Sequence, residues 1–350
     1  MPRTTLATIA AAAGVSTATV SKVLNARPDV GQETRARVER ALADHGYVAQ
    51  RRKQTRTRRR VRTVGLVCDD LLSPYTVEVL RGVSGAAAEA NVDVVVALLE
   101  DVLGGLRSSS GAWVRRLRAA GHEGMIVVAC ELTELQGDAL DRAGLPVVAI
   151  DALSLPSIEV ATVGSTNGTG ALAATQHLIG LGHERIAFVG GPETSSCSQA
   201  RLHGYLAAMT TAGLPVDPAL ISHGPFITAT GVEEGRRLLA LAEPPTAVFA
   251  ANDPIALGVA EAARLNGRGV PADLSVVGFD DTFLAESSTP PLTTVRQPLQ
   301  QMGSFAFGTL MRLVGGQQPD TPHIELATEL VIRDSTAPYR PSGVRKAGAR

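Results

Sequence analysis

Seven short apolar runs, rich in valine, isoleucine and alanine, constrain most strongly what this chain can fold into. They read TVGLVCDD, VDVVVALLE, EGMIVVAC, LPVVAID, RIAFVGG, TAVFAAND and LSVVGFDD, and helical stretches separate them between residues 63 and 281. Near-continuous runs of this kind are typical of strands that are buried on both faces. Their alternation with helices predicts parallel sheets covered by helices on either side.

Length and composition add broad limits to this prediction. At 350 residues the chain exceeds one ordinary core, so two or three domains are expected. No apolar run reaches the roughly 20 residues that span a bilayer, and the N-terminal stretch has the pattern of an amphipathic helix rather than a secretory signal. The cysteines are scattered among apolar residues, so we expect buried thiols in a cytoplasmic protein, with no disulfide and no metal site: Cys68, Cys130 and Cys197.

The charges divide the chain into a basic head and an acidic body. Residues 1–62 hold 14 Lys and Arg against four acids, a net charge of +10, whereas residues 63–350 carry a net charge of −11. The densest basic run is RRKQTRTRRR at residues 51–60. This asymmetry predicts a polyanionic partner at the basic end. For the run taken alone, a solvated linker is the alternative.

The first 45 residues have the pattern of three short helices. Apolar spacing predicts one helix over residues 5–13, ended by Gly14, and a second that begins after Ser16 as its N-cap. A third helix is expected over about residues 32–45, with Gly46 as its C-terminal stop. Two short helices around a tight glycine turn are typical of a helix-turn-helix unit, although such pairs also occur as plain packing units.

The second of these helices has a face suited to DNA. Its inward positions are Val20, Val23 and Leu24. Its outward positions carry small polar side chains and one cation: Thr17, Ala18, Ser21, Lys22 and Asn25. Short side chains let a helix backbone approach the base edges of a major groove, where polar groups can form hydrogen bonds.

The stretch LATIAAAAGVSTATVSKVLNARPDVGQETRARVERALADHGYVAQ resembles the headpiece of LacI/GalR-family transcription regulators. The signature V-S-x-x-T-V-S-x-V-L-N is intact at Val15–Asn25, and Tyr47 stands where the family keeps a tyrosine after the third helix. The resemblance implies that Thr17, Ala18 and Lys22 face base edges. It implies phosphate contacts from the following residues: Thr5, Ser16, Thr19, Ser21 and Asn25. Because Ala18 cannot donate a hydrogen bond, base choice is expected to rest on Thr17, Lys22 and the linker.

The linker has the family's usual length but departs from its pattern. The family forms a hinge helix there, with a leucine wedged into the minor groove. In this chain Arg56 stands at the leucine position, Lys53 at the neighbouring small residue, and residues 48–62 contain no leucine. We expect arginines to line a narrowed minor groove and neutralise phosphates instead, with a steep salt dependence and a smaller DNA bend. A disordered spacer is the alternative. The expected DNA-binding residues of this region are Tyr47, Arg51, Arg52 and Arg56.

Several predicted strands of the acidic body end in acids or amides: Asp69, Asp70, Asp151, Asn252, Asp253, Asp280 and Asp281. In parallel sheets, ligands bind beyond the carboxyl ends of the strands, so these groups are well placed to bind one. Capping of the following helix is the alternative for each residue, above all for Asp253 before Pro254.

The body resembles the two-lobed periplasmic-binding-protein fold of LacI/GalR regulators in LSPYTVEVLRGV, HERIAFVGGP, QARLHGY, AVFAANDPIALGV, LSVVGFDD and PPLTTVRQP. The resemblance implies two α/β lobes that close on a small ligand, with crossings near residues 160–165, 290–296 and 321–327. The expected order is a headpiece at 1–47, a basic linker at 48–62, an effector-binding and dimerisation domain at 63–340 and a flexible tail at 341–350. The first lobe would take about 63–162 and 293–321, and the second about 163–290 and 322–337.

The resemblance also implies which residues contact the effector: Asp69, Tyr75, Asp151, Arg201, Phe226, Asn252 and Asp280. Carboxylates accept and a guanidinium donates hydrogen bonds, so Arg201, Asn252 and Asp280 suit vicinal hydroxyls. Tyr75 and Phe226 offer flat faces for a sugar ring, with ordinary lobe packing as the alternative.

The motifs of common enzymes are missing from the sequence. It contains no G-x-S-x-G, P-loop, H-E-x-x-H or C-x-x-C, so we expect neither catalysis nor a cofactor or metal. We predict a ligand-responsive repressor of carbohydrate-utilisation genes, released by a saccharide inducer from a near-palindromic double-stranded DNA operator. The alternative is a co-repressor type that binds DNA together with a purine-like ligand. A homodimer rather than a tetramer is expected, because the stretch PYRPSGVRKAGAR lacks the heptad leucines of the tetramer helix that some relatives in the family append.

Overall fold

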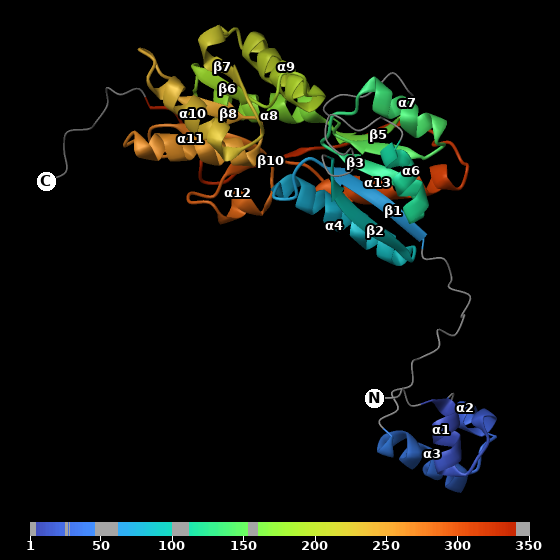
Figure 1. Cartoon of the computed structure of the whole chain (residues 1–350). Helices are drawn as coiled ribbons and strands as arrows, with labels where there is room; N and C mark the ends of the chain where they lie inside the picture. The colour runs from blue at the N-terminus through green and yellow to red at the C-terminus, as the bar shows by residue number, and fades with distance from the viewer. Residues whose placement is uncertain are drawn as a thin grey trace, which may run out of the picture. The chain divides into compact units, whose positions relative to one another are not determined.

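The computed structural model describes residues 5–24, 27, 29–45, 62–99, 112–152 and 160–340. The chain divides into two compact units, Met1–Arg60 and Val61–Arg350 (Figure 1). The linker and the C-terminal tail lie outside the described residues, as do Asn25, Tyr47 and the arginine run.

The first unit consists of α1 (Leu6–Ala13), α2 (Thr17–Leu24) and α3 (Gln32–Asp44). Gly14 ends α1 in the left-handed conformation with φ of 63°, which a residue without Cβ adopts at little cost. Ser16 caps α2, because its hydroxyl accepts the Thr19 amide. Among the residues described in this unit, seven buried side chains form the core: Ile9, Ala10, Ala13, Val20, Val23, Val38 and Ala41. The three predicted helices are therefore confirmed.

No single described helix is long and apolar enough to cross a bilayer. The helices α1 and α2 meet the length and composition requirement only together, and they are bent by 101° with respect to each other. That bend lies in the range of helix-turn-helix pairs.

The first lobe of the second unit is a parallel sheet with helices on both faces. Its strand order in the described chain is β11-β5-β4-β3-β1-β2. The strands are β1 (Arg62–Cys68), β2 (Val92–Leu98), β3 (His122–Val128), β4 (Val147–Ile150), β5 (Ala161–Ser165) and β11 (His323–Leu326). One face packs on α4 (Pro74–Glu89) and α13 (Leu299–Val314), and the other on α6 (Ala112–Ala120) and α7 (Glu134–Arg142). Because side chains alternate between the two faces along β1, Leu66 packs on the first face and Val67 on the second.

The second lobe repeats this architecture in the order β12-β10-β9-β8-β6-β7. Its strands are β6 (Ile186–Gly190), β7 (Ile221–His223), β8 (Ala247–Ala250), β9 (Ser275–Asp280), β10 (Thr293–Arg296) and β12 (Glu329–Val331). Only β12 among the described strands runs antiparallel to its neighbour. One face packs on α8 (Asn167–Gly180) and α9 (Ser196–Thr211), and the other on α10 (Thr228–Leu239) and α11 (Asp253–Leu265). Two short helices complete the lobe, η1 (Pro218–Leu220) and α12 (Phe283–Ser287). The expected two-lobed α/β fold is confirmed.

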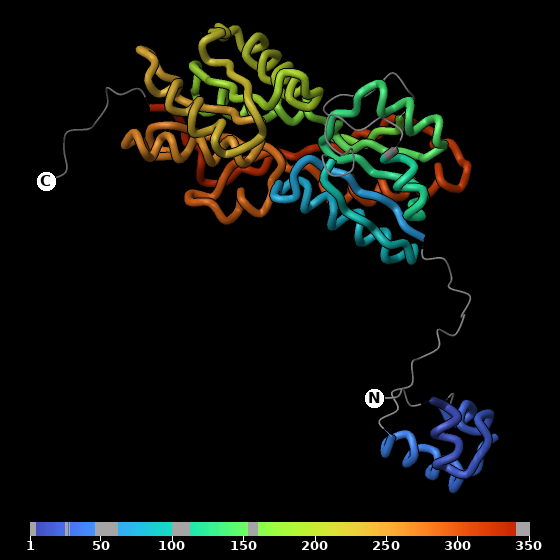
Figure 2. Tube along the Cα trace, viewed as in Figure 1, coloured from blue at the N-terminus to red at the C-terminus, as the bar shows by residue number. Residues whose placement is uncertain are grey.

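Within the described residues the chain passes between the lobes three times, from β5 into α8, from β10 into α13 and from β11 into β12 (Figure 2). The expected boundaries assigned residues 293–296 to the first lobe and residues 323–326 to the second. Strand pairing reverses both assignments, because β10 pairs with β9 and β11 pairs with β5. Likewise β5 stays in the first lobe as far as Ser165. Each strand completes its hydrogen bonds in one sheet before the chain leaves it.

Candidate functional site

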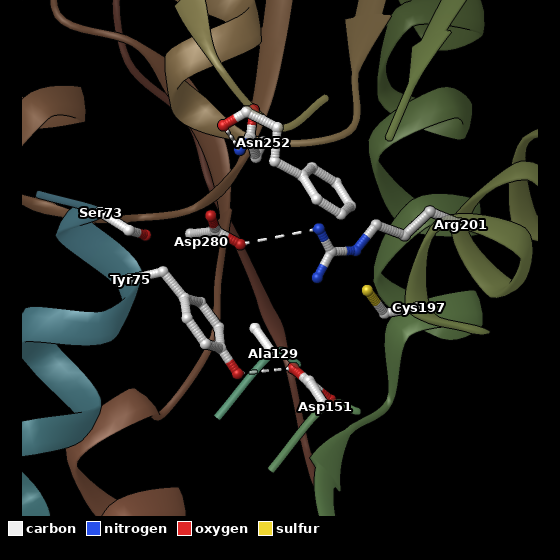
Figure 3. A pocket seen from close by; sticks show the side chains of 9 residues that line it. Ser73, Tyr75, Ala129, Asp151, Cys197, Arg201, Asn252 and Asp280 are labelled. Atoms are coloured by element: carbon white, nitrogen blue, oxygen red, sulfur yellow. Dashed lines mark hydrogen bonds and ion pairs between the residues drawn. The ribbon is translucent and has the colours of Figure 1, made fainter. Parts of the chain in front are cut away.

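A pocket lies between the lobes, at the carboxyl ends of strands from both sheets (Figure 3). The first lobe contributes Ser73, Tyr75, Ala129 and Asp151, and the second contributes Cys197, Arg201, Phe226, Asn252 and Asp280. We call this set the interlobe pocket. The free space at its centre measures about 80 Å³. Six of the seven expected effector residues line it.

Asp69 is the expected residue that does not line the interlobe pocket. It is exposed just after β1, and its carboxylate faces the buried Cys130 thiol. Burial, together with this carboxylate, raises the pKa of Cys130. The prediction that Asp69 follows a strand is therefore correct, but its side chain lies beside Cys130, just after β3 of the same lobe, and not in the pocket.

The Arg201 guanidinium is held by hydrogen bonds, an ion pair and an aromatic ring. The residue sits in the second turn of α9, is 2% exposed, and its Nε donates to Asn167 Oδ1 at 2.8 Å. One terminal nitrogen donates to the Ala251 carbonyl and lies 3.7 Å from Asp280 Oδ1. Its guanidinium carbon lies 3.9 Å from the centre of the Phe279 ring. Figure 3 shows the guanidinium pointing into the pocket toward Asp280. The cation is thus held in one place before any ligand binds.

Asp280 ends β9 and is 3% exposed. Its Oδ1 accepts a hydrogen bond from Gln297 Nε2 at 2.7 Å. Burial raises the pKa of Asp280 to about 7, although the Arg201 cation and the Gln297 hydrogen bond both act in the opposite direction. At neutral pH this group can therefore gain or lose a proton with a small change in its surroundings.

The first-lobe wall consists mainly of Tyr75 and Asp151. The Tyr75 hydroxyl donates to Asp151 Oδ2 at 2.8 Å, and Figure 3 shows this bond as a dashed line between the two side chains. Burial and the adjacent carboxylate raise the pKa of Tyr75 well above its usual value, so the hydroxyl keeps its proton. Burial also raises the pKa of Asp151, and the Arg201 cation opposes that shift.

Asn252 and Phe226 form the remaining side of the second-lobe wall. Asn252 caps α11, because its Oδ1 accepts the Ile255 amide at 2.9 Å. Its Nδ2 donates to the Phe226 carbonyl at 3.2 Å and fixes the loop that carries the ring. Gly191 makes room for that ring, since a Cβ there would lie 2.1 Å from a Phe226 ring atom. Asn252 therefore both caps α11 and lines the pocket, so the two interpretations are compatible.

The backbone is strained at the edge of the pocket. Ala129, Asp151 and Asp280 have φ values of 50°, 43° and 107°, although none is a glycine. Left-handed conformations cost free energy for residues with a Cβ, and they cluster where a side chain must be aimed at a ligand. This strain marks the pocket independently of its polar groups.

Three lining residues were missed in the sequence, namely Ser73, Ala129 and Cys197. Cys197 precedes Arg201 by four positions on α9, a spacing that places both on one helix face. The sequence could have indicated Cys197 by this spacing. Burial raises the pKa of the Cys197 thiol, so it faces the pocket as a neutral group.

Most of the described residues that were expected to contact DNA lie on α2 and its cap. Ser16, Thr17, Ala18 and Lys22 are exposed, whereas Thr19 and Ser21 are half-buried. Lys22 Nζ lies 2.9 Å from Asp29 Oδ2. Thr5 caps α1 by accepting the Thr8 amide. The other expected DNA-binding residues lie outside the described part of the chain: Asn25, Tyr47, Arg51, Arg52 and Arg56.

No group of three or more His, Cys, Asp or Glu side chains has a metal-binding arrangement among the described residues. The three cysteines are free and buried.

Comparison with known proteins assigns the chain to a family. Residues 5–50 match the family model of bacterial regulatory proteins of the lacI family, and residues 175–336 match the periplasmic binding protein-like domain. The chain is 34% identical to the HTH-type transcriptional regulator CelR of Thermobifida fusca, over 95% of this chain and 98% of that protein.

Two solved structures are similar over nearly the whole chain. The complex of transcriptional regulator CelR with cellobiose has a TM-score of 0.69 and 35% identity, covering 95% of this chain and all of that chain. The lac repressor dimer bound to operator and the anti-inducer ONPF has a TM-score of 0.68 and 28% identity, covering 96% of this chain and all of that one. The chain therefore belongs to the LacI family of transcriptional regulators and is not an enzyme.

Proposed function

We propose that this regulator represses carbohydrate-utilisation genes and is released from its operator by a saccharide inducer. The observation that carries the proposal is the interlobe pocket, where Asp151 and Asp280 accept, Arg201 donates, and Tyr75 and Phe226 present flat faces. This combination suits a ligand with many hydroxyls and apolar C–H faces. The similar CelR was solved with cellobiose, which supports a saccharide.

The size of the pocket indicates how such a ligand would act. Its free space of about 80 Å³ is far smaller than the roughly 300 Å³ at the lower end of ligand pockets. We infer that the lobes separate to admit a saccharide and then close around it in a different arrangement. A ligand shifts this equilibrium only by its difference in affinity for the two arrangements. The operator-bound arrangement is the one that the inducer binds less well.

On the DNA side, we infer that α2 is the recognition helix. Thr17 and Lys22 would hydrogen-bond base edges, and Ala18 would contact a thymine methyl or make room for it. Phosphate contacts are proposed for the small hydroxyl groups and for Asn25: Thr5, Ser16, Thr19, Ser21 and Asn25. Since DNA is the partner, we expect the protein to act in the cytoplasm.

We propose that Tyr47 and the arginine-rich linker, including Arg51, Arg52 and Arg56, also bind DNA. Each neutralised phosphate contributes about 0.9 to the slope of log affinity against log salt. Alanine at every arginine of residues 51–60 should therefore flatten this slope by several units. An unchanged slope, together with a DNA bend equal to that of a leucine-wedged relative, would refute the minor-groove hypothesis.

We propose that the regulator acts as a homodimer whose two recognition helices enter successive major grooves of a near-palindromic operator. The similar lac repressor was solved as an operator-bound dimer. Two large apolar side chains close in sequence to the pocket residues Ser73 and Asp280 are exposed, Leu72 at 89% and Phe283 at 60%. We infer that these two side chains lie in the dimer contact area. Leu72→Glu and Phe283→Glu should dissociate the dimer, as measured by sedimentation velocity. If the wild-type protein itself is a monomer at micromolar concentration, the proposal of a homodimer is refuted.

A co-repressor type is the second candidate. Arg201 packs its flat guanidinium on Phe279, and the Phe226 ring centre lies 5.9 Å from the same guanidinium. Such flat surfaces also suit a purine-like ring. Under this alternative the ligand would tighten operator binding instead of weakening it.

The deciding experiment recovers and sequences genomic fragments bound by the full-length protein at physiological salt. A shared palindrome beside sugar-transport or glycosidase genes is the expected result. Binding of the recovered fragment is then measured with cellobiose, with other saccharides and with purine bases. Weakening by a saccharide supports induction, and tightening by a purine supports the alternative. Fragments without a common motif would overturn the proposal of a specific repressor.

A further inference from the structure

Five buried residues are linked in a closed ring of hydrogen bonds and one ion pair at the interlobe pocket. We name this set the hinge ring: Ser165, Asn167, Arg201, Asp280 and Gln297. Their exposed fractions are 2%, 8%, 2%, 3% and 4%, so solvent does not substitute for the bonds among them.

The ring closes through specific donors and acceptors. Arg201 Nε donates to Asn167 Oδ1 at 2.8 Å, and Asn167 Nδ2 donates to the Ser165 carbonyl at 3.1 Å. The Ser165 hydroxyl donates to Gln297 Oε1. Gln297 Nε2 donates to Asp280 Oδ1 at 2.7 Å, and Asp280 is paired with Arg201 at 3.7 Å. In a medium of low polarity such linked bonds strengthen one another.

Members of the ring belong either to the pocket or to a crossing between the lobes. Arg201 and Asp280 line the pocket. Ser165 and Asn167 flank the first crossing, and Gln297 lies in the second. Thr166, between Ser165 and Asn167, accepts the backbone N–H of Thr328 in the third crossing at 3.0 Å. The ring therefore connects the pocket directly to two crossings and, through Thr166, to the third.

Gln297 occupies the only position of the ring where a side-chain amide bridges a carboxylate and a hydroxyl. An ionised Asp280 only accepts hydrogen bonds, so the amide nitrogen must face it and the amide oxygen must face Ser165. When the charge or the partners of Asp280 change, the preference of Gln297 for facing Ser165 with its amide oxygen rather than its amide nitrogen therefore changes as well.

We propose that Gln297 is a positioning residue that transmits the contacts of Asp280 in the pocket to Ser165 at the first crossing, so that the hinge ring couples ligand binding to lobe closure. The proposal rests on the proposed function in one respect, the identity of the interlobe pocket as the ligand site. A buried glutamine that only fills space and completes the hydrogen bonds of its neighbours would not transmit changes at Asp280 to Ser165.

The test that needs no ligand uses the titration of Asp280. The pKa of Asp280 is raised to about 7 in the folded protein, whereas it is near 4 in the unfolded chain. Asp280 therefore contributes its full stabilisation below about pH 4, and this contribution is lost as the pH rises through 7. Free energy of unfolding in urea is measured for the full-length protein from pH 5 to 9. Other ionisable groups also face Asp280, and an Asp280→Asn background therefore identifies its share: Arg201, Asp253, Asp151, Tyr75 and Cys197.

Gln297→Met removes the donor that lowers the Asp280 pKa, so the midpoint of the stability loss should move up by about half a pH unit or more. Ser165→Ala should move it in the same direction, although Ser165 does not contact Asp280. In the Gln297→Met background, Ser165→Ala should have no further effect on the midpoint. In the Asp280→Asn background neither substitution should shift it.

Thr175→Val is the matched control, because Thr175 is fully buried in the same lobe and its hydroxyl donates to Ala171 outside the ring. It should lower stability equally at every pH. If Gln297→Met and Ser165→Ala also behave in this way, Gln297 is only a packing residue and the proposal is overturned.

A second test uses cellobiose as the probe and the recovered operator fragment. In wild type, cellobiose should weaken operator binding, and in Gln297→Met this weakening should fall by about tenfold while cellobiose affinity changes less. Equal losses in both quantities would contradict the proposal. If cellobiose does not bind wild type at all, the choice of saccharide fails, but the titration of Asp280 still decides the ring.

Discussion

The headpiece face and the interlobe pocket present their binding groups in opposite ways. The proposed DNA face is one short helix with its cap, and its polar groups are exposed or half-buried and bonded mainly within a turn, as Ser16 is to Thr19. The pocket gathers residues from Ser73 to Asp280, and its second-lobe groups are buried and bonded across distant segments. Substitutions on the first surface should change binding alone. Substitutions in the second should change stability and binding together.

The strongest test of this contrast is Arg201→Met. The substitution leaves the Asp280 carboxylate and the Asn167 oxygen buried without their partner. We expect the free energy of unfolding of the body to fall by about 3–5 kcal/mol at pH 8, and saccharide binding to be lost. Without the cation the pKa of Asp280 rises further, so protonation relieves part of the loss at pH 5.5. Urea denaturation at the two pH values measures both effects.

Arg264→Met supplies the control for that experiment. Arg264 is also paired with a carboxylate, Glu261, at 2.7 Å, but its side chain is 69% exposed. Exposed pairs contribute little, so the unfolding curve should not move. Equal effects of the two arginine substitutions would refute the contrast between a buried and a solvated network.

A core substitution in the headpiece tests whether that unit is independent of the body. Val20 is fully buried in a core of seven side chains. Val20→Ala removes about two methylene equivalents and leaves a cavity, at a cost of about 2 kcal/mol. In so small a unit this loss should unfold the headpiece and abolish operator binding. Calorimetry should show the body transition unchanged, and a lowered body transition would mean that the two units unfold together.

The same contrast explains how much of the molecule could be predicted. The headpiece helices and the Ser16 cap follow from local spacing, and the buried strands follow from their apolar runs. Strands such as β7 and β10 were missed because ISH and TTVR are short and rich in polar residues, and only their neighbours make them strands. Six pocket residues were identified through the family resemblance. Ser165, Asn167 and Gln297 were not, because their importance comes from bonds between segments up to 132 residues apart.

A substitution on the DNA face should leave stability alone. Lys22 is half-exposed and lies in the middle of the proposed recognition face. Lys22→Ala should weaken specific operator binding by about 10- to 100-fold, the range for losing a good base contact. Binding to unrelated DNA should change far less, and the unfolding curve should be the same as that of wild type. A uniform loss on all sequences, with a salt slope smaller by about one, would mean that Lys22 contacts a phosphate instead.

The smallest expected effect comes from Asp29, the partner of Lys22. Their side chains are 54% and 50% exposed, and the Lys22 hydrogen bond lowers the pKa of Asp29. Because DNA must take Lys22 from this carboxylate, Asp29→Asn should strengthen operator binding about twofold at low salt, and the gain should disappear at high salt. Unfolding should be unchanged. If Asp29→Asn weakened operator binding instead, Asp29 would be positioning Lys22 toward its base, and the DNA face would depend on a bonded network as the pocket does.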